Sequence, residues 1–155
     1  MPIELRTILL AEDNPKDVEL TLEALTEHNL ANRLTVVKDG VEVMEYLKRE
    51  GKFKMRRPGN PAILLLDIKM PRMDGIEVLR TIRTDPALKM LPVVILTSSR
   101  EEQDLIRSYE LGVNAYIVKP VDFKEFIEAI KLIGVFWAII NELPPIGVSS
   151  NGDKS

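Results

Sequence analysis

Short apolar runs alternate with longer segments of helical periodicity along this chain. The clearest run is Ile63, Leu64, Leu65 and Leu66, which is apolar at every position. A strand with one face in water alternates apolar and polar residues, whereas an unbroken run is typical of a strand buried inside a parallel sheet. Runs of this kind predict strands over residues 7–11, 33–37, 63–66, 93–96 and 115–118.

Helical periodicity fills the segments that follow these runs. In the first segment Val18, Leu22 and Leu25 are spaced so that they share one face of a helix. Helices are predicted over about residues 15–28, 41–50, 76–84, 101–111 and 122–140. Strand–helix units joined by right-handed crossovers predict an α/β protein, in which a five-stranded parallel sheet forms the middle of a three-layer α/β/α sandwich.

Length and composition fit one globular domain. The chain has 155 residues, of which 45% are apolar and 29% charged, and its net charge is -3. That charge offers no general attraction to nucleic acid or to an anionic membrane. The sequence has no cysteine and no export signal at its start, so a cytoplasmic protein is expected. We expect one domain over residues 1–143 and a disordered tail over residues 144–155.

Polar side chains follow four of the predicted strands. Glu12 and Asp13 follow the first strand, Asp67 the third, Thr97 the fourth and Lys119 the fifth. In a sheet ordered 2-1-3-4-5 the first and third strands are neighbours, and the three carboxylates converge where the strand order reverses. Carboxylates this close need a cation, and oxygen ligands without histidine or cysteine favour Mg²⁺, with Mn²⁺ as a second fit.

Lys119 and Thr97 are expected on the other side of the same site. An ammonium group and a hydroxyl donor suit a phosphoryl group, because the negative charge of that group must be neutralised during transfer. Asp67 stands between these two groups and the metal. The residue types therefore predict phosphoryl transfer with Asp67 as the nucleophile.

These motifs together resemble the receiver domain of two-component response regulators, which has a flavodoxin-like fold. The resemblance covers about residues 5–142. It is carried by Glu12-Asp13, by Asp67 with Met70-Pro71 and Asp74-Gly75, by Thr97, and by Lys119-Pro120. Each motif alone is common, but all of them in this order, each closing the expected strand, make a specific signal.

The resemblance implies a phosphoacceptor switch and assigns roles to single residues. A sensor histidine kinase would transfer a phosphoryl group from its phosphohistidine to Asp67. Magnesium would be held by Glu12, Asp13, Asp67 and the backbone carbonyl of Lys69, and Lys119 would bind a phosphoryl oxygen. Such a protein belongs to a phosphorelay and catalyses only its own phosphorylation and dephosphorylation.

The resemblance also implies how the signal leaves the site. The Lys119-Pro120 peptide bond is expected to be cis, an isomer that proline tolerates. After phosphorylation the Thr97 hydroxyl would turn toward the phosphoryl group, and Tyr116 would fill the space that it leaves. This step would shift the packing of the surface made by the fourth helix, the fifth strand and the fifth helix.

Further features resemble the single-domain regulators that pair with bacterial phytochromes. They are Glu12 to Pro15 with Asp17, a basic loop over residues 51–61, Asp85-Pro86, and Phe136-Trp137. The likeness implies a phytochrome-type sensor kinase as partner and a symmetric homodimer through the fourth helix, fifth strand and fifth helix. The last helix is apolar on more than one side, which gives the expected interface as Ile133, Phe136, Trp137 and Ile140.

Simpler explanations stay open for these residues. Glu12 and Asp13 also suit the positive end of the first helix, Thr97 suits a helix cap, and Tyr116 suits plain core packing. A nucleotide-binding protein of this class is disfavoured, because the turn after the first strand is acidic rather than glycine-rich. The serious alternative is a protein-interaction module that keeps the receiver fold and is not phosphorylated.

Overall fold

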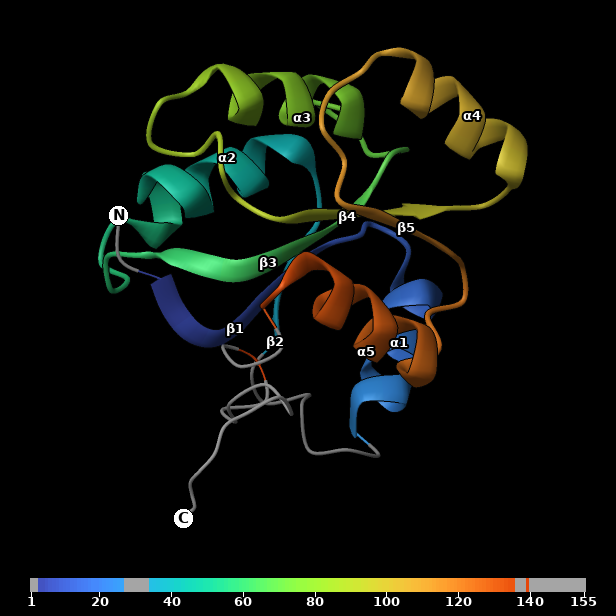
Figure 1. The fold of residues 1–155 in the computed structure, drawn as a ribbon. Coiled ribbons are helices and arrows are strands. Elements are labelled where there is room, and N and C mark those ends of the chain that lie inside the picture. The colour runs from blue at the N-terminus through green and yellow to red at the C-terminus, as the bar shows by residue number, and fades with distance from the viewer. Residues whose placement is uncertain (1–2, 27–33, 136–138, 140–155) are drawn as a thin grey trace, which may run out of the picture.

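A five-stranded parallel sheet with helices on both faces forms the protein (Figure 1). The computed structural model describes residues 3–26, 34–135 and 139. The strands are β1 (Ile3–Ala11), β2 (Leu34–Val37), β3 (Asn60–Asp67), β4 (Val93–Thr97) and β5 (Ala115–Val118). Their order is β2-β1-β3-β4-β5, which confirms the predicted α/β class and sheet order.

Helices α1 and α5 cover one face of the sheet, and α2, α3 and α4 cover the other (Figure 1). They are α1 (Pro15–Thr26), α2 (Gly40–Lys48), α3 (Gly75–Thr84), α4 (Arg100–Ser108) and α5 (Phe123–Ile133), with a short 3-10 turn, η2 (Gly51–Phe53), after α2. Side-chain oxygens of Asp39, Asp74, Ser99 and Asp122 accept the N–H of the third residue of the helix that each begins. The sequence therefore fixes where these helices start.

Two hydrophobic cores lie against the two faces of the sheet. Leu64 and Leu66 of β3 pack with Val78 and Ile82 of α3, while Ile63 and Leu65 point to the opposite core. That second core includes Phe126 and Ile130 of α5. Because successive residues of β3 enter different cores, every position of the strand must be apolar, and this explains its unbroken run.

Three helix details differ from the sequence prediction. The sequence spacing predicts that Val41, Met44 and Leu47 of α2 face inward, but the buried side chains are Val43, Tyr46 and Leu47, and Val41 and Met44 are only half-buried. Helix α4 ends at Ser108 instead of residue 111. Helix α5 ends at Ile133, because Gly134 adopts a left-handed conformation with φ 90° that stops the helix.

Hydrogen bonds from Arg56 hold the basic loop before β3 in place. Arg56 donates from Nε to the carbonyl of Tyr46 and from Nη1 to the carbonyls of Arg57 and Gly59, and its guanidinium carbon lies 4.1 Å from the Tyr46 ring centre. Phe136, Trp137, Ile140 and residues 144–155 lie outside the described residues. In the part of the chain that is described, no helix is long and apolar enough to cross a membrane.

Candidate functional site

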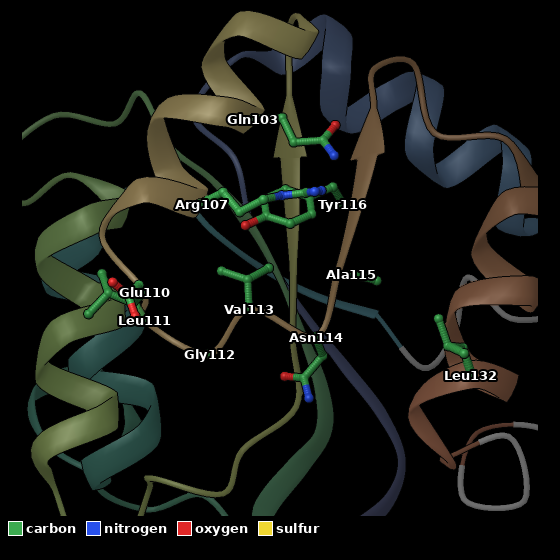
Figure 2. Close-up of a pocket in the computed structure, with 10 residues that line it drawn as sticks. All are labelled: Gln103, Arg107, Glu110, Leu111, Gly112, Val113, Asn114, Ala115, Tyr116 and Leu132. Atoms are coloured by element: carbon green, nitrogen blue, oxygen red, sulfur yellow. The ribbon is translucent and has the colours of Figure 1, made fainter.

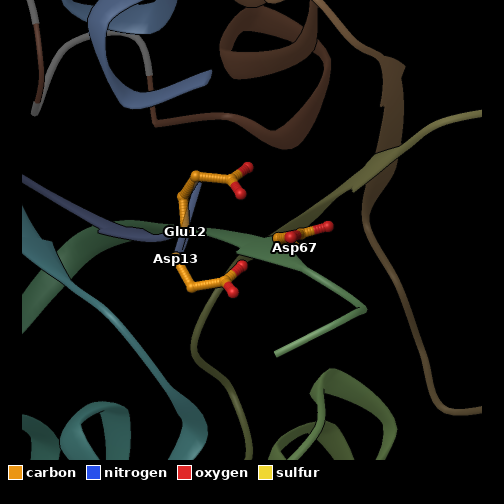
Figure 3. A group of neighbouring side chains, drawn as sticks. All are labelled: Glu12, Asp13 and Asp67. Atoms are coloured by element: carbon orange, nitrogen blue, oxygen red, sulfur yellow. The ribbon is translucent and has the colours of Figure 1, made fainter. Parts of the chain in front are cut away.

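Three carboxylates meet at the carboxyl ends of β1 and β3 (Figure 3). The two strands are neighbours, with Ala11 paired to Leu66, so the residues that follow emerge side by side. Glu12 is 1% exposed and Asp67 5% exposed, whereas Asp13 is open to solvent. Oxygens of Glu12, Asp13 and Asp67 lie within 4.8 Å of one another, a spacing that suits a single divalent cation.

Lys119 brings a positive charge to these acids from the loop after β5. Its Nζ lies 3.2 Å from Glu12 Oε1 and 3.5 Å from Asp67 Oδ1. The nearest carboxylate is that of Asp17 in the first turn of α1, with Nζ to Oδ2 at 2.9 Å. The Lys119-Pro120 bond is cis, and the Lys119 backbone N–H donates to the Thr97 carbonyl at 2.8 Å.

The charges of this site are imperfectly balanced. Burial and the nearby Asp67 raise the pKa of Glu12 to about 7, and burial also raises the pKa of Asp67 above its ordinary value. Burial alone would lower the pKa of Lys119, but its hydrogen bond to Asp17 and the charges of Asp67 and Glu12 raise it. One ammonium therefore does not offset the acids, and a further cation would lower the electrostatic cost of the site.

Thr97 of β4 and Tyr116 of β5 lie on the same face of the sheet, diagonally across the two strands. Tyr116 pairs with Ile95, two residues before Thr97, and side chains two residues apart on a strand point the same way. Thr97 is fully buried, and among the described residues its Oγ1 has no hydrogen-bond partner. A buried hydroxyl without a partner costs free energy, so a rotation that found it an acceptor would be favourable.

Tyr116 is half-buried beside a pocket of about 560 Å³ formed by α4, the loop after it, β5 and α5 (Figure 2). The Arg107 guanidinium of α4 lies 4.9 Å from the centre of the Tyr116 ring. This contact ties the ring to α4. A change at Tyr116 would therefore reach both α4 and the pocket.

Lys69 lines the acidic site, and its side chain pairs with Glu102 of α4. A cavity of about 200 Å³ is lined by Glu12, Asp13, Asn14, Asp17, Asp67, Lys69, Ser98, Glu102 and Lys119. Lys69 Nζ lies 3.6 Å from Glu102 Oε2 of α4. Its side chain is exposed, so the loop after β3 contributes its backbone rather than a buried charge to the site.

Two acids of this site, Asp17 and Glu102, had no predicted role in it. Asp17 is the nearest partner of Lys119, and Glu102 pairs with Lys69 and also accepts the Ser98 N–H at 3.0 Å. The signal for Asp17 was its position in the first turn of a helix that begins at the site. For Glu102 the only signal was its position in the first turn of α4, which many acids share.

The expected interface residue Ile133 packs partly against the protein's own core. Its neighbour Leu132 is 80% exposed on the same turn of α5. The other three expected interface residues lie outside the described residues. Leu132 is therefore the apolar residue that this turn of α5 presents to solvent.

Fold and site together define a doubly wound α/β protein whose acidic site lies where the strand order reverses. The chain belongs to the response regulators: residues 8–131 match the family described as "Response regulator receiver domain". It is similar to the response regulator Rcp1 of Synechocystis sp., with 37% identity over 139 residues that cover 90% of this chain and 93% of Rcp1.

Solved structures give the same assignment. The bacteriophytochrome response regulator AtBRR is 57% identical, with a TM-score of 0.83 over 90% of this chain and 99% of that chain. The phosphorylated cyanobacterial phytochrome response regulator RcpA is 36% identical, with a TM-score of 0.68 over 91% and 99% of the two chains. A Mn²⁺-bound form of Rcp1 is 38% identical, with a TM-score of 0.67 over 90% and 99%.

Proposed function

We propose that this protein is a single-domain response regulator that accepts a phosphoryl group on Asp67 from a sensor histidine kinase, of the kind associated with phytochromes. The observation that carries the proposal is the approach of the Glu12, Asp13 and Asp67 oxygens to within 4.8 Å of one another beside the Lys119 ammonium. The similarity to bacteriophytochrome response regulators supports the choice of kinase.

The donor set fits Mg²⁺, and Mn²⁺ suits the same oxygens. Carboxylates of Glu12, Asp13 and Asp67 and the backbone carbonyl of Lys69 would hold the ion. The raised pKa values of Glu12 and Asp67 support this assignment, because they indicate unbalanced negative charge. When bound, the ion neutralises charge on the acceptor and on the phosphoryl oxygens. The Mn²⁺-bound form of Rcp1 is a precedent among relatives.

Asp67 is assigned as the acceptor by the family resemblance, and it lies close both to the other two carboxylates and to the Lys119 ammonium. One Asp67 oxygen would attack phosphorus as the bond from phosphorus to the imidazole nitrogen of the kinase breaks. Lys119 would bind a phosphoryl oxygen with its ammonium, from a position now 3.5 Å from Asp67 Oδ1. The acceptor must be ionised to react, and Lys119 opposes the effect of burial on the pKa of Asp67.

Thr97 and Tyr116 form the proposed output of the switch. A phosphoryl oxygen would supply the acceptor that the Thr97 hydroxyl lacks among the described residues. Rotation of Thr97 would empty space on the face that it shares with Tyr116. Since Arg107 of α4 rests on the Tyr116 ring, movement of the ring would alter the surface of α4, β5 and α5.

The same surface is the proposed site of a symmetric homodimer. Exposed apolar side chains on it are Val118 of β5 and Leu132 of α5. The pocket of Figure 2 lies among α4, β5 and α5 and includes Leu132 in its lining. An apolar surface on the output face suits a second copy of the chain.

Incubation with Mg²⁺ and acetyl phosphate tests the proposed function. The intact mass should rise by one phosphoryl group, and peptide mapping should find it on Asp67. The Asp67→Asn variant should show no rise, while Asp85→Asn, a matched change at a helix end away from the site, should behave like the wild type. A folded protein that takes up no phosphoryl group from acetyl phosphate or any sensor kinase would support the interaction module instead.

A further inference from the structure

The ammonium of Lys119 is held more closely by Asp17 than by the acids of the proposed metal site. The distances from Nζ are 2.9 Å to Asp17, 3.2 Å to Glu12 and 3.5 Å to Asp67. Asp17 belongs to α1 and lines the same cavity, but it is not one of the three acids whose oxygens could share a metal. In this structure the Lys119 ammonium is therefore shared between Asp67 and Asp17.

Local structure fixes Asp17 in this position. Asn14 begins α1, and its Oδ1 accepts the N–H of Lys16 at 2.9 Å and of Asp17 at 3.3 Å. The Thr21 hydroxyl donates to the Asp17 carbonyl at 2.9 Å one turn later. The Asp17 side chain is only 26% exposed. A short side chain on a capped first turn has little freedom to follow the lysine when Lys119 moves.

Every N–H of the Lys119 ammonium faces a carboxylate. An ammonium has about three donors, and Asp17, Glu12 and Asp67 each lie within hydrogen-bond distance of it. A phosphoryl group on Asp67 brings further oxygens and about two negative charges. Lys119 must give up or weaken an existing contact to bind one of these oxygens.

We propose that Asp17 is a positioning residue that opposes the phosphorylated state. It competes with the phosphoryl group for Lys119, and its own charge repels that group. Both effects have the same sign, so Asp17 lowers the affinity of the site for a phosphoryl group. This inference rests on the proposed phosphorylation of Asp67.

Binding of beryllofluoride at saturating Mg²⁺ tests the competition. The Asp17→Asn variant should bind this phosphoryl mimic roughly fivefold more tightly than the wild type, the scale of one partly exposed ion pair. Glu19→Gln removes the same charge from an exposed position on the same helix and should stay within about twofold of the wild type. Equal or weaker binding by Asp17→Asn would overturn the proposal.

Measurements with Mg²⁺ alone separate competition from a general effect of charge. Removal of an acid near a cation weakens cation binding, so Asp17→Asn should bind Mg²⁺ no more tightly than the wild type while it binds the mimic more tightly. An increase in Mg²⁺ affinity that accounts for the whole gain in mimic affinity would contradict a role through Lys119.

A double-mutant cycle tests the Asp17 to Lys119 contact without any ligand. Unfolding of the wild type, Asp17→Asn, Lys119→Gln and the double variant is followed in urea with a chelator present. The two changes should be non-additive, because each removes a partner of the other. Additive changes in the free energy of unfolding would show that Asp17 and Lys119 do not stabilise each other. A wild type that binds no beryllofluoride would contradict the proposed function, whereas a wild type that binds it as tightly as Asp17→Asn would contradict the role of Asp17 alone.

Discussion

Asp39 accepts two hydrogen bonds from the guanidinium of Arg72, with Nε to Oδ2 at 2.9 Å and Nη2 to Oδ1 at 3.1 Å. Asp39 begins α2, and Arg72 belongs to the loop between β3 and α3 that also carries Lys69. Arg72 has φ 64°, a left-handed conformation that disfavours side chains other than glycine, asparagine and aspartate. The ion pair thus holds a strained loop that begins next to Asp67.

Substitutions of Arg72 should separate the ion pair from the strain. Arg72→Ala loses the pair and keeps the strain, whereas Arg72→Gly loses the pair but relieves the strain. We therefore expect urea denaturation to rank the free energy of unfolding as Arg72→Ala below Arg72→Gly. Asp39→Asn keeps a side-chain oxygen that can cap α2 but loses the charge that pairs with Arg72. It should therefore lower the affinity for Mg²⁺ only indirectly, through the loop that carries Lys69. If Arg72→Ala were as stable as Arg72→Gly, the left-handed conformation at position 72 would not be strained.

Gly40 should not tolerate a side chain. A Cβ at this position would lie 2.0 Å from the Met73 carbonyl oxygen, which belongs to the same loop. The backbone of one element would have to move, and we expect Gly40→Ala to lower the free energy of unfolding by about 3 kcal/mol. Gly134→Ala is the control, since there a Cβ meets no atom within 4 Å and only the positive φ opposes it. Denaturation of both variants gives the comparison.

The sequence predicted the parts of this molecule that are set by local pattern. The run from Ile63 to Leu66 gave β3, and the polar residue after each strand gave Asp67, Thr97 and Lys119 at one edge of the sheet. The edge was predictable because parallel strands share their carboxyl ends.

Contacts between distant loops were not predictable in the same way. Asp17 and Lys119 are separated by 102 residues, and Asp39 and Arg72 by 33. Their pairing depends on how far each side chain reaches and on the exact path of two loops. No periodicity encodes that, since exposed acids and bases are common and most make no specific pair.

Arg83 illustrates the same limit and gives a further prediction. From α3 it donates to the carbonyls of Leu111 and Gly112 in the loop after α4, and of Lys89 and Leu91 in the loop before β4. Arg83→Ala should cost about 2–3 kcal/mol of unfolding free energy, because several carbonyls lose a charged donor. Arg83→Lys should restore little, since an ammonium lacks the fork of donors.

Hydrogen exchange should locate this effect in the loop after α4. Residues 109–114 should exchange faster in Arg83→Ala than in the wild type, because the loop loses its tie to α3. Arg80→Ala on the same helix is the control, since Arg80 lies over the Tyr109 ring at 4.9 Å and makes a single contact of that kind. Equal exchange in both variants would show that Arg83 does not hold the loop.

The metal-free protein should lose stability as the pH rises toward neutrality. The pKa of Glu12 rises from 4.5 to about 7 on folding, so the folded state holds a proton that the unfolded chain releases. The free energy of unfolding is therefore highest below the unfolded pKa and falls as the pH passes from about 5 to 7.5, by up to about 3 kcal/mol. Asp67 contributes with the same sign.

Urea denaturation with a chelator at several pH values measures this slope. Asp67, Asp13, Asp17 and Lys119 all face Glu12, and Glu12→Gln leaves them in place while it removes the titrating carboxyl. The difference in slope between the wild type and Glu12→Gln isolates the contribution of Glu12 from that of the other titrating groups. Mg²⁺ should flatten the slope, because it binds the ionised acids. An equal slope in both proteins would refute the assignment to Glu12.

The apolar surface of α4, β5 and α5 should drive self-association. Leu132 is 80% exposed, so a glutamate at position 132 would place a charge in any interface there without disturbing the core. Sedimentation velocity should find a dimer of the wild type and a monomer of Leu132→Glu, each with and without beryllofluoride. Met90→Glu changes a residue that is 83% exposed in the loop between α3 and β4, outside this surface, and should leave the dimer intact. A wild type that stays monomeric at high concentration in both states, or a dimer that survives Leu132→Glu, would exclude this surface as the interface.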